Sequence, residues 1–299
     1  ISLTPNRADC LSYMGIAREL AAKLRRPLRT LEHLPAETKE KKKNQIQAEI
    51  SPDTGCARIT LLEINNFEMV ESPIWLRQSL KASGMRSVNL VVDITNYVML
   101  ESGQPIHAYD KDLLKSKILR VRNGKTGESL TTLDDQTISL TPDDIMICDD
   151  QTPIGLAGIM GGKSSEVHSK TRSVVVEVAH FDQRQIRKTA KRLSFHTEAS
   201  HRFERGIDLE NIQKVANRVL QLLSATLKQG GQSIESHSLT DLYPAPPKEK
   251  LIALRVKRAQ ALLSLAFLTP EKCIEHLTAL QLNLVDQTPD RLLFKIPSW

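Results

Sequence analysis

Hydrophobic residues recur along the chain in two patterns, and the first of them predicts strands. The sequences ARITLLEI (57–64) and SVVVEVAHF (173–181) are rich in branched aliphatic residues, as strands are. The segment SVVVEVAHF is apolar almost throughout, which is typical of a strand buried on both faces. Short apolar runs also alternate with turn-forming sequences between residues 117 and 149, namely KILRVRN, ESLTTL, TISL and DIMICD. We expect a group of short strands there.

The second pattern places apolar residues three or four positions apart and predicts helices. Asp9, Asp93 and Asp182 each stand where a helix cap would, and a longer helix is expected from Asp208. A further short helix is expected over 73–83, and GQPIHAYD (103–110) is expected to be a loop. Helices and strands together predict an α+β fold, in which a mixed α/β domain contains several short antiparallel strands.

Two segments without apolar periodicity divide the chain. Residues 34–44 include KEKKKN and read as a charged linker or exposed ribbon, and residues 243–250 are rich in proline. We therefore expect three parts: 1–42, the end of one domain with a linker; 43–242, the central domain; and 243–299, the start of a winged-helix-like domain. The chain starts at Ile1 and stops soon after an apolar run, so we expect it to be a piece of a longer protein.

Composition narrows the class of protein only slightly. The 299 residues carry a net charge of +6, which suits a nucleic-acid partner but equally suits a protein that is merely basic. Four scattered cysteines lack metal-ligand spacing, which favours reduced thiols in a cytoplasmic protein. An apolar run long enough to span a membrane is not found, so we expect no membrane partner.

Four segments carry the residues that suggest chemistry: DITNYVMLESGQPIHAYD (93–110), PIGLAGIMGG (153–162), SVVVEVAHF (173–181) and FHTEASHRFERG (195–206). We expect them to build one hydrolytic pocket. Glu177 interrupts an apolar strand, which is unfavourable unless the carboxylate meets a ligand or forms a buried salt bridge with an arginine. The glycines of GLAGIMGG indicate either a tight bend between strands or close approach of the backbone to a ligand.

Metal and covalent mechanisms are both disfavoured by spacing. His196 and His201 are five residues apart, unlike the paired histidines of a zinc helix, so we expect no metal here. Ser200 and His201 are adjacent but lack a nucleophile-elbow motif. A positioned water attacking an activated ester remains, with His107, Asn96, Thr197 and glycine-loop amides as candidate hydrogen-bonding groups. Each of these groups, taken singly, could instead be structural.

Longer motifs make the sequence recognisable. TPNRADCLSYMGIAREL, VDITNYVMLESGQPIHAYD, GLAGIMGG and HTEASHRFERGID resemble the beta subunits of bacterial phenylalanyl-tRNA synthetases, over essentially the whole chain. The resemblance implies a ligase of two alpha and two beta subunits that attaches phenylalanine to tRNA(Phe), using ATP and magnesium. It places the synthetic site in the alpha subunit and the magnesium-binding residues beyond Trp299, so no cofactor is expected in this segment. The central domain would then be an editing domain that hydrolyses mischarged tyrosyl-tRNA(Phe).

The resemblance also implies roles for seven residues. It places His107 and Asn96 near the ester and the terminal adenosine, and it places Thr197 in the pocket with them as a third catalytic candidate. Glu177 would read the tyrosine hydroxyl. The other three residues would line the amino-acid pocket: Pro105, Gly161 and Ala199.

The sequence leaves one alternative open. The domain could be an RNA-binding or scaffold module of the same synthetase without editing activity, in which case these polar residues would be structural. The remaining charged residues of the FHTEASHRFERG segment are expected to hold that loop in place through ion pairs and hydrogen bonds.

Overall fold

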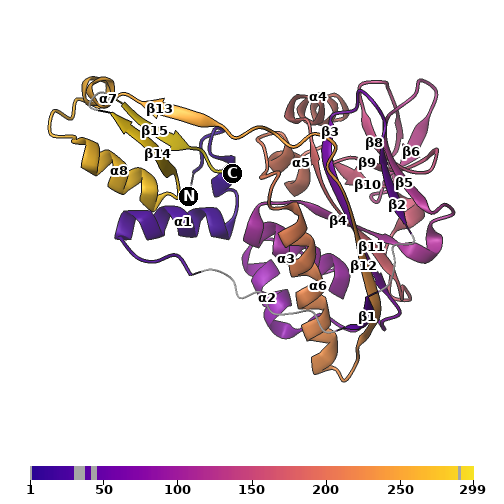
Figure 1. Cartoon of the computed structure of the whole chain (residues 1–299). Coiled ribbons are helices and arrows are strands. Elements are labelled where there is room, and N and C mark those ends of the chain that lie inside the picture. Colours follow the sequence, from indigo (N-terminus) through magenta and orange to yellow (C-terminus); the bar gives the residue numbers. More distant parts are fainter. Residues whose placement is uncertain (1, 30–37, 42–45, 289–290) are drawn as a thin grey trace.

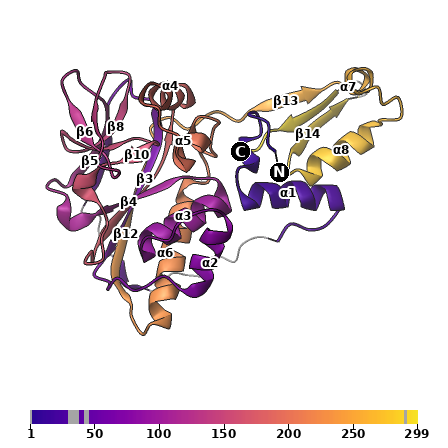
Figure 2. The ribbon, with the colours of Figure 1, turned by 180° about the vertical axis from the view of Figure 1, so that it is seen from behind.

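The computed structural model describes residues 2–29, 38–41, 46–288 and 291–299 (Figure 1). A large central body is accompanied by a smaller one that is built from both ends of the chain (Figures 1 and 2). The smaller body contains a three-stranded sheet of β13 (Leu251–Leu254), β14 (Asn283–Thr288) and β15 (Arg291–Lys295). It also contains the helices α1 (Tyr13–Leu24), α7 (Val256–Leu263) and α8 (Pro270–Ala279). The division into three domains stays a prediction.

A five-stranded sheet forms the middle of the central body. Its strand order is β1-β12-β3-β11-β4, and every neighbouring pair is antiparallel except β1 and β12. Its strands are β1 (Thr38–Lys41), β3 (Cys56–Asn65), β4 (Ile106–Asp110), β11 (Val174–Phe181) and β12 (Ile234–Leu242). The near-continuous apolar strand β11 therefore lies inside the sheet, between β3 and β4, as its sequence predicts.

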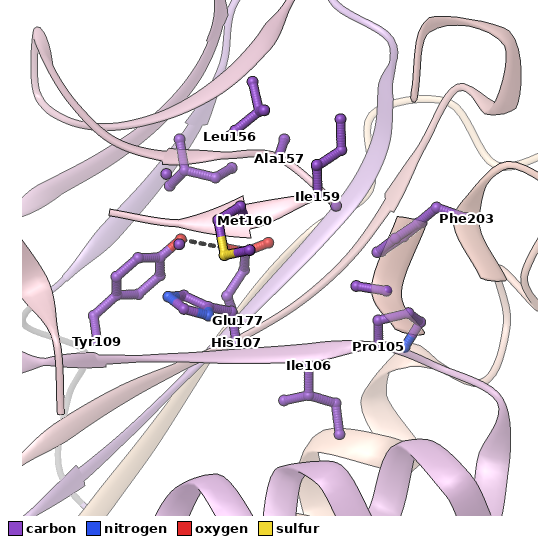
Figure 3. Close-up of a pocket in the computed structure, with 15 residues that line it drawn as sticks. Pro105, Ile106, His107, Tyr109, Leu156, Ala157, Ile159, Met160, Glu177 and Phe203 are labelled. Atoms are coloured by element: carbon purple, nitrogen blue, oxygen red, sulfur yellow. Dashed lines mark hydrogen bonds between the residues drawn. The ribbon is translucent and has the colours of Figure 1, made fainter. Parts of the chain in front are cut away.

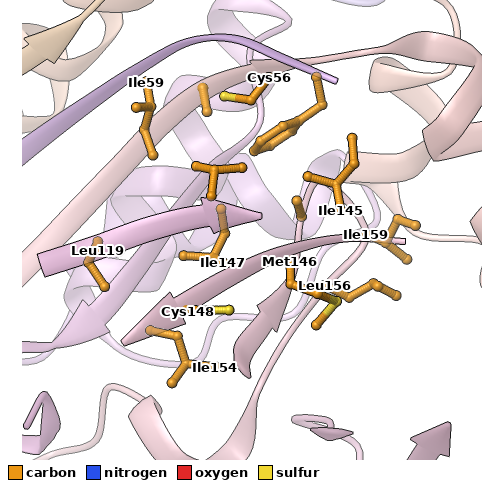
Figure 4. Packing of buried hydrophobic residues seen from close by; sticks show 14 of the residues in the cluster. Cys56, Ile59, Leu119, Ile145, Met146, Ile147, Cys148, Ile154, Leu156 and Ile159 are labelled. Carbon is orange, nitrogen blue, oxygen red and sulfur yellow. The ribbon is translucent and has the colours of Figure 1, made fainter. Parts of the chain in front are cut away.

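A second five-stranded sheet packs against one face of the first. Its order is β10-β9-β8-β5-β2, and the hairpin β6–β7 lies beside it. Its strands and those of the hairpin are β2 (Gln47–Ile50), β5 (Ile118–Asn123), β6 (Ser129–Thr131), β7 (Thr137–Ser139), β8 (Ile145–Asp149), β9 (Thr152–Leu156) and β10 (Met160–Gly161). Aliphatic side chains from both sheets form a core between them (Figure 4). The short strands predicted for 117–149 are confirmed.

Three helices cover the other face of the middle sheet: α2 (Ile74–Ala82), α3 (Leu90–Ser102) and α6 (Ile212–Gln229). Two shorter helices, α4 (Gln183–Leu193) and α5 (Glu198–Phe203), follow β11. Three turns of 3₁₀ helix complete the elements: Ala8–Cys10, Lys111–Leu113 and Lys163–Ser165. Helices and mostly antiparallel sheets confirm the α+β fold class.

Three predicted helix starts are wrong. The caps of α1, α3 and α6 are Ser12, Asn89 and Asn211 rather than Asp9, Asp93 and Asp208. Asp93 is fully buried and accepts hydrogen bonds from the hydroxyls of Ser72 and Ser87 and from the amide of Val88, so tertiary contacts occupy its carboxylate. Asp182 does cap α4 as predicted, accepting from two amides of its first turn.

Two segments expected to be irregular contain strands. Thr38–Lys41, within the predicted linker, pairs in parallel with β12, while residues 34–37 and 42–44 lie outside the described residues. GQPIHAYD was expected to be a loop, yet residues 106–110 form β4 against β11. Strand pairing to an already buried neighbour overrides the weak local preference of these sequences.

Two composition-based predictions concern cysteines and membranes. All four cysteines are buried free thiols. Among the described residues, none of the helices has both the length and the hydropathy needed to cross a lipid bilayer.

Candidate active site

A cavity of about 80 Å³ lies between the two sheets of the central body (Figure 3). Its wall comes from β4, β11, the β8–β10 region and α5. Apolar side chains and glycines make up most of the wall. Among the described residues that line it, the titratable groups are His107, Tyr109 and Glu177. A concave, mostly apolar space with a few converging polar groups is the usual form of a small-ligand site.

Strand register explains why these three side chains meet. Glu177 of β11 lies directly opposite His107 of β4, and Val175 lies opposite Tyr109. Residues two apart on a strand share a face, so His107, Tyr109 and Glu177 all point to the same side of the sheet. The Tyr109 hydroxyl donates a 2.5 Å hydrogen bond to Oε2 of Glu177, and the rings of His107 and Tyr109 meet edge to face with centroids 4.6 Å apart.

Burial sets the protonation of the carboxyl. Glu177 is only 6% exposed, and loss of solvation raises its pKa to about 7, although the hydrogen bond from Tyr109 acts in the opposite direction. Burial and the neighbouring carboxyl also raise the pKa of Tyr109, so its phenol stays protonated and remains a donor. Glu177 is thus paired with a phenol rather than with an arginine, the structural partner that its sequence context suggested.

Desolvation has the opposite sign for the imidazole. It lowers the pKa of His107 to about 4, so this half-buried ring is neutral at pH 7. A neutral imidazole has one donor and one acceptor nitrogen, and a group with so low a pKa is a weak base. His107 is therefore better suited to orienting a ligand or a water than to removing its proton.

Two glycines of GLAGIMGG are required by close packing. A Cβ on Gly161 would lie 2.4 Å from Cε1 of His107, so only glycine leaves room for this ring. Gly158 has a φ of +66°, and a Cβ there would lie 2.8 Å from Phe203 of α5. The segment is a bend between β9 and β10, as one interpretation predicted, and its close approach is to side chains of the protein itself.

Thr197 holds α5 in place rather than lining the cavity. Its hydroxyl accepts from the amide of Ser200 in a capping box and donates to the carbonyl of Ile159, both at 3.0 Å. These bonds attach the start of α5 to the β9–β10 bend. Ala199, two residues later, does line the cavity. Thr197 therefore affects the cavity only indirectly, through its hydrogen bonds to α5 and to the β9–β10 bend.

Asn96 lies apart from the other predicted residues. It sits half-buried on α3, which packs on the opposite face of the middle sheet, and it is not part of the cavity wall. The cavity does bring together five of the seven predicted residues, namely Pro105, His107, Gly161, Glu177 and Ala199.

Sequence reasoning missed Tyr109. It stands in the quoted motif IHAYD, but the segment was expected to be a loop, so no alternation was applied to it. Had the strand been recognised, its period of two would have placed Tyr109 beside His107. Phe203 was missed for a similar reason, because the α5 helix is too short to show a periodic pattern.

The charged residues of the FHTEASHRFERG segment stabilise it, as predicted. Arg202 is buried, pairs with Glu198 and donates to the carbonyls of Glu198 and Leu11. Arg205 pairs with Glu204 and contacts the His201 ring.

The described residues contain one cluster with potential metal ligands, and it lies outside the cavity. Asp9, Cys10 and Glu19 bring one ligand atom each within 4.8 Å of the others. The guanidinium of Arg7 contacts all three side chains, so a cation of the protein itself already occupies the space. The cluster therefore fixes the segment that leads into α1.

Comparisons with known proteins agree with the motifs. Residues 55–228 match the model of the B3/4 domain. The chain is 43% identical over 263 residues to the "Phenylalanine--tRNA ligase beta subunit" of Geobacter sulfurreducens, covering 88% of this chain and 32% of that protein. It is 38% identical over its whole length to the protein of the same name from Geobacter metallireducens, of which it covers 37%.

The chain thus spans about a third of the length of the curated relatives it matches. A solved N-terminal fragment of the phenylalanyl-tRNA synthetase beta subunit from Pyrococcus horikoshii aligns over 99% of this chain and 80% of that one. Its TM-score is 0.44 at 14% identity, too low to support an argument. The resemblance seen in the motifs is confirmed: the chain belongs to the B3/4 domain family and is a homologue of phenylalanine–tRNA ligase beta subunits.

Proposed function

We propose that this chain is the editing part of a phenylalanine–tRNA ligase beta subunit and that its cavity hydrolyses tyrosyl-tRNA(Phe). The names of its relatives support the ligase assignment. The complete enzyme would contain two alpha and two beta subunits, with the synthetic site in the alpha subunit. It would use ATP and magnesium in the cytoplasm to attach phenylalanine to its tRNA.

The observation that carries the proposal is a buried carboxyl already bonded to a phenol. Glu177 accepts from Tyr109 through Oε2 and has a second oxygen in the cavity wall. A substrate tyrosine would place its hydroxyl on that second oxygen. Phenylalanine would leave it unsatisfied, which is unfavourable by roughly 1–3 kcal/mol. A synthetic pocket shaped for phenylalanine rejects an added hydroxyl only about 100-fold, so a second pocket that requires the hydroxyl would improve accuracy.

Hydrolysis of the ester needs an oriented water. As water adds to the carbonyl carbon it would lose one proton to solvent and leave a tetrahedral oxyanion. The bond between that carbon and the ribose oxygen would then break, and the ribose oxygen would take a proton back from solvent, which releases tyrosine and tRNA. His107 would orient the ester or the water through its neutral ring, because its low pKa makes it a weak base. Orientation and preformed hydrogen bonds then supply the rate enhancement. Thr197 would act as a positioning residue through α5, and a role for Asn96 stays a prediction.

Deacylation of tyrosyl-tRNA(Phe) by the assembled enzyme tests the proposal. Glu177→Gln should lower kcat/KM for the tyrosyl ester roughly 10- to 100-fold, because a carboxylate accepts a phenol more strongly than an amide does. His107→Ala should lower kcat about 100-fold or more through loss of one orienting group. Glu166→Gln, at an exposed position outside the cavity wall, is the matched control and should behave as the wild type.

The same experiment distinguishes an editing site from the scaffold alternative. Equal deacylation by wild type and both cavity variants would contradict the assignment of the site. Absence of deacylation by the wild type, together with normal tRNA binding, would favour the RNA-binding or scaffold module.

A further inference from the structure

Helix α4 carries an exposed row of positive charge next to the cavity. Its sequence QRQIRKTAKRL contains five basic and no acidic residues. Its buried side chains are Ile186, Thr189 and Ala190, which pack toward the core. All five basic residues are exposed, so the charge is confined to the solvent side of the helix.

Two of the five basic residues have structural partners. Lys188 pairs with Asp143 at 2.6 Å, and Arg192 pairs with the fully buried Asp144 at 2.5 Å. The other three, Arg184, Arg187 and Lys191, are exposed, and among the residues that the structure describes none of them has an acidic partner. We call these three residues the α4 ridge.

The α4 ridge forms one continuous face. Positions i, i+3 and i+7 share a side of a helix, and at 1.5 Å per residue they span about 10 Å along the axis. None of the large exposed apolar side chains lies on α4, which disfavours a lipid surface or an apolar partner. A charged row of this length instead suits a polyanion.

The helix stands directly beside the cavity wall. Ile186, on its buried side, would lie 3.2 Å from a Cβ on Gly158, which lines the cavity. Residues 194–197 then lead from α4 into α5, whose Ala199 and Phe203 also line it. α4 and α5 lie together at one end of the central body (Figure 1). Residues 183–206 contain seven lysines and arginines. Four of them are in ion pairs with acidic residues, so the three residues of the α4 ridge carry the positive charge that this segment presents to solvent.

We infer that the α4 ridge binds backbone phosphates of the RNA strand whose aminoacylated 3′ end enters the cavity. This inference rests on the proposed function, because that function brings an RNA terminus to the adjoining wall. Arginine and lysine on an exposed helix face contact phosphates without reading sequence, and each contact releases counterions. The α4 ridge would therefore supply affinity and register, while the cavity would supply selectivity for the amino acid.

A binding experiment tests the inference without requiring catalysis. The probe is a fluorescent RNA hairpin with a single-stranded 3′ end, titrated with this chain at several salt concentrations. The triple variant Arg184→Gln, Arg187→Gln, Lys191→Gln should raise Kd roughly 10-fold or more and reduce the salt slope by about 2 to 3. The control is Lys81→Gln, Arg86→Gln, Lys170→Gln, which removes the same charge from exposed positions outside the cavity wall.

Equal effects of the two triple variants would overturn the inference, because net charge alone would then explain the change. A charge-preserving triple, Arg184→Lys, Arg187→Lys, Lys191→Arg, should restore most of the affinity. Failure of that restoration, with all variants folded by circular dichroism, would also count against phosphate binding.

Hydrolysis separates this inference from the proposed function. The α4 triple variant should hydrolyse 3′-O-tyrosyl adenosine, which has no phosphate, at the wild-type rate, and should show a raised KM for tyrosyl-tRNA. If the wild type hydrolyses neither substrate, the proposed function fails, and the RNA titration still decides whether the α4 ridge binds phosphate. A loss of rate on the adenosine substrate in the triple variant would show that α4 supports the cavity structurally, and would overturn the inference.

Discussion

The two faces of β11 belong to the same strand but differ in what they pack against and in the groups they carry. Val174, Val176 and Val178 face α2, α3 and α6 in an apolar core. Val175, Glu177, Ala179 and Phe181 face the second sheet, and there a carboxyl interrupts the apolar row. Both rows are buried, so burial alone does not distinguish a structural face from a chemical one.

The difference lies in what each face packs against. Helices fill the first face with side chains of matched shape, and its stability comes from buried apolar area. The second face meets a bend of glycines and small residues that leaves a cavity, and a polar group there is tolerated because Tyr109 satisfies it. Substitutions on the two faces should therefore have separable consequences for stability and for activity.

The largest expected effect is on the pH dependence of folding in Glu177→Gln. The pKa of Glu177 is about 7 in the folded chain against 4.5 for the free group, so the folded chain retains a proton that the unfolded chain has lost. The contribution of Glu177 to the stability of the wild type therefore falls as the pH rises from 4.5 to 7. Gln removes that loss, so the variant should gain up to about 3 kcal/mol relative to wild type by pH 8.

Urea unfolding between pH 4 and 8 measures this gain as a difference between variant and wild type. His107 has the opposite sign, since its pKa falls from 6.5 to about 4, and its contribution to stability rises with pH in that window. The variant curve should therefore rise between pH 4 and 6.5. Parallel curves for Glu177→Gln and the exposed control Glu166→Gln would contradict the burial of the Glu177 charge.

The second effect is catalytic and concerns Gly161→Ala. The added methyl would lie 2.4 Å from the His107 ring and would displace this ring within the cavity. The face of β11 that packs against the helices would be unchanged. Deacylation should fall about 100-fold with little change in the midpoint of unfolding, because a misplacement of about 1 Å can have that consequence. Gly230→Ala, at a glycine with only ordinary contacts beyond α6, is the control. A Gly161→Ala enzyme with normal activity would show that the position of His107 is unimportant.

The smallest effect should come from a substitution on the face of β11 that packs against the helices. Val176→Ala removes two methyl groups from a fully buried position and should lower the free energy of unfolding by about 2 kcal/mol. Because the side chain points away from the cavity, kcat/KM on tyrosyl-tRNA should remain near the wild-type value below the melting range. A loss of activity as large as that of Gly161→Ala would mean that the two faces are coupled.

Sequence patterns predicted the fold class and β11 because these features depend on composition over many residues. The α3 and α6 starts were misplaced because several polar residues near each start could act as caps, and tertiary hydrogen bonds decided the use of Asp93. β4 was missed because its strand character comes from pairing with β11 rather than from its own residues.

The candidate site was predicted mainly through resemblance and one physical anomaly. Glu177 was recognisable as a carboxylate in an apolar strand, without any structural information. Its partner was not, because the Tyr109–Glu177 bond spans 68 positions in the chain and depends on strand register. Thr197 and Asn96 show the limit of motif reasoning: both belong to shared motifs, yet neither side chain lines the cavity.

The hydrogen bond between Tyr109 and Glu177 sets the scale of the selectivity that this carboxyl can give the proposed editing step. Since one oxygen of the carboxyl is held by a phenol of the chain itself, a substrate hydroxyl would engage the other oxygen. One such hydrogen bond contributes about 0.5–3 kcal/mol, depending on whether the carboxyl is ionised, which corresponds to a preference for tyrosine of roughly 2- to 150-fold. Selectivity beyond that would have to come from the rest of the cavity and from the synthetic site, so several contacts would share the selection of the amino acid.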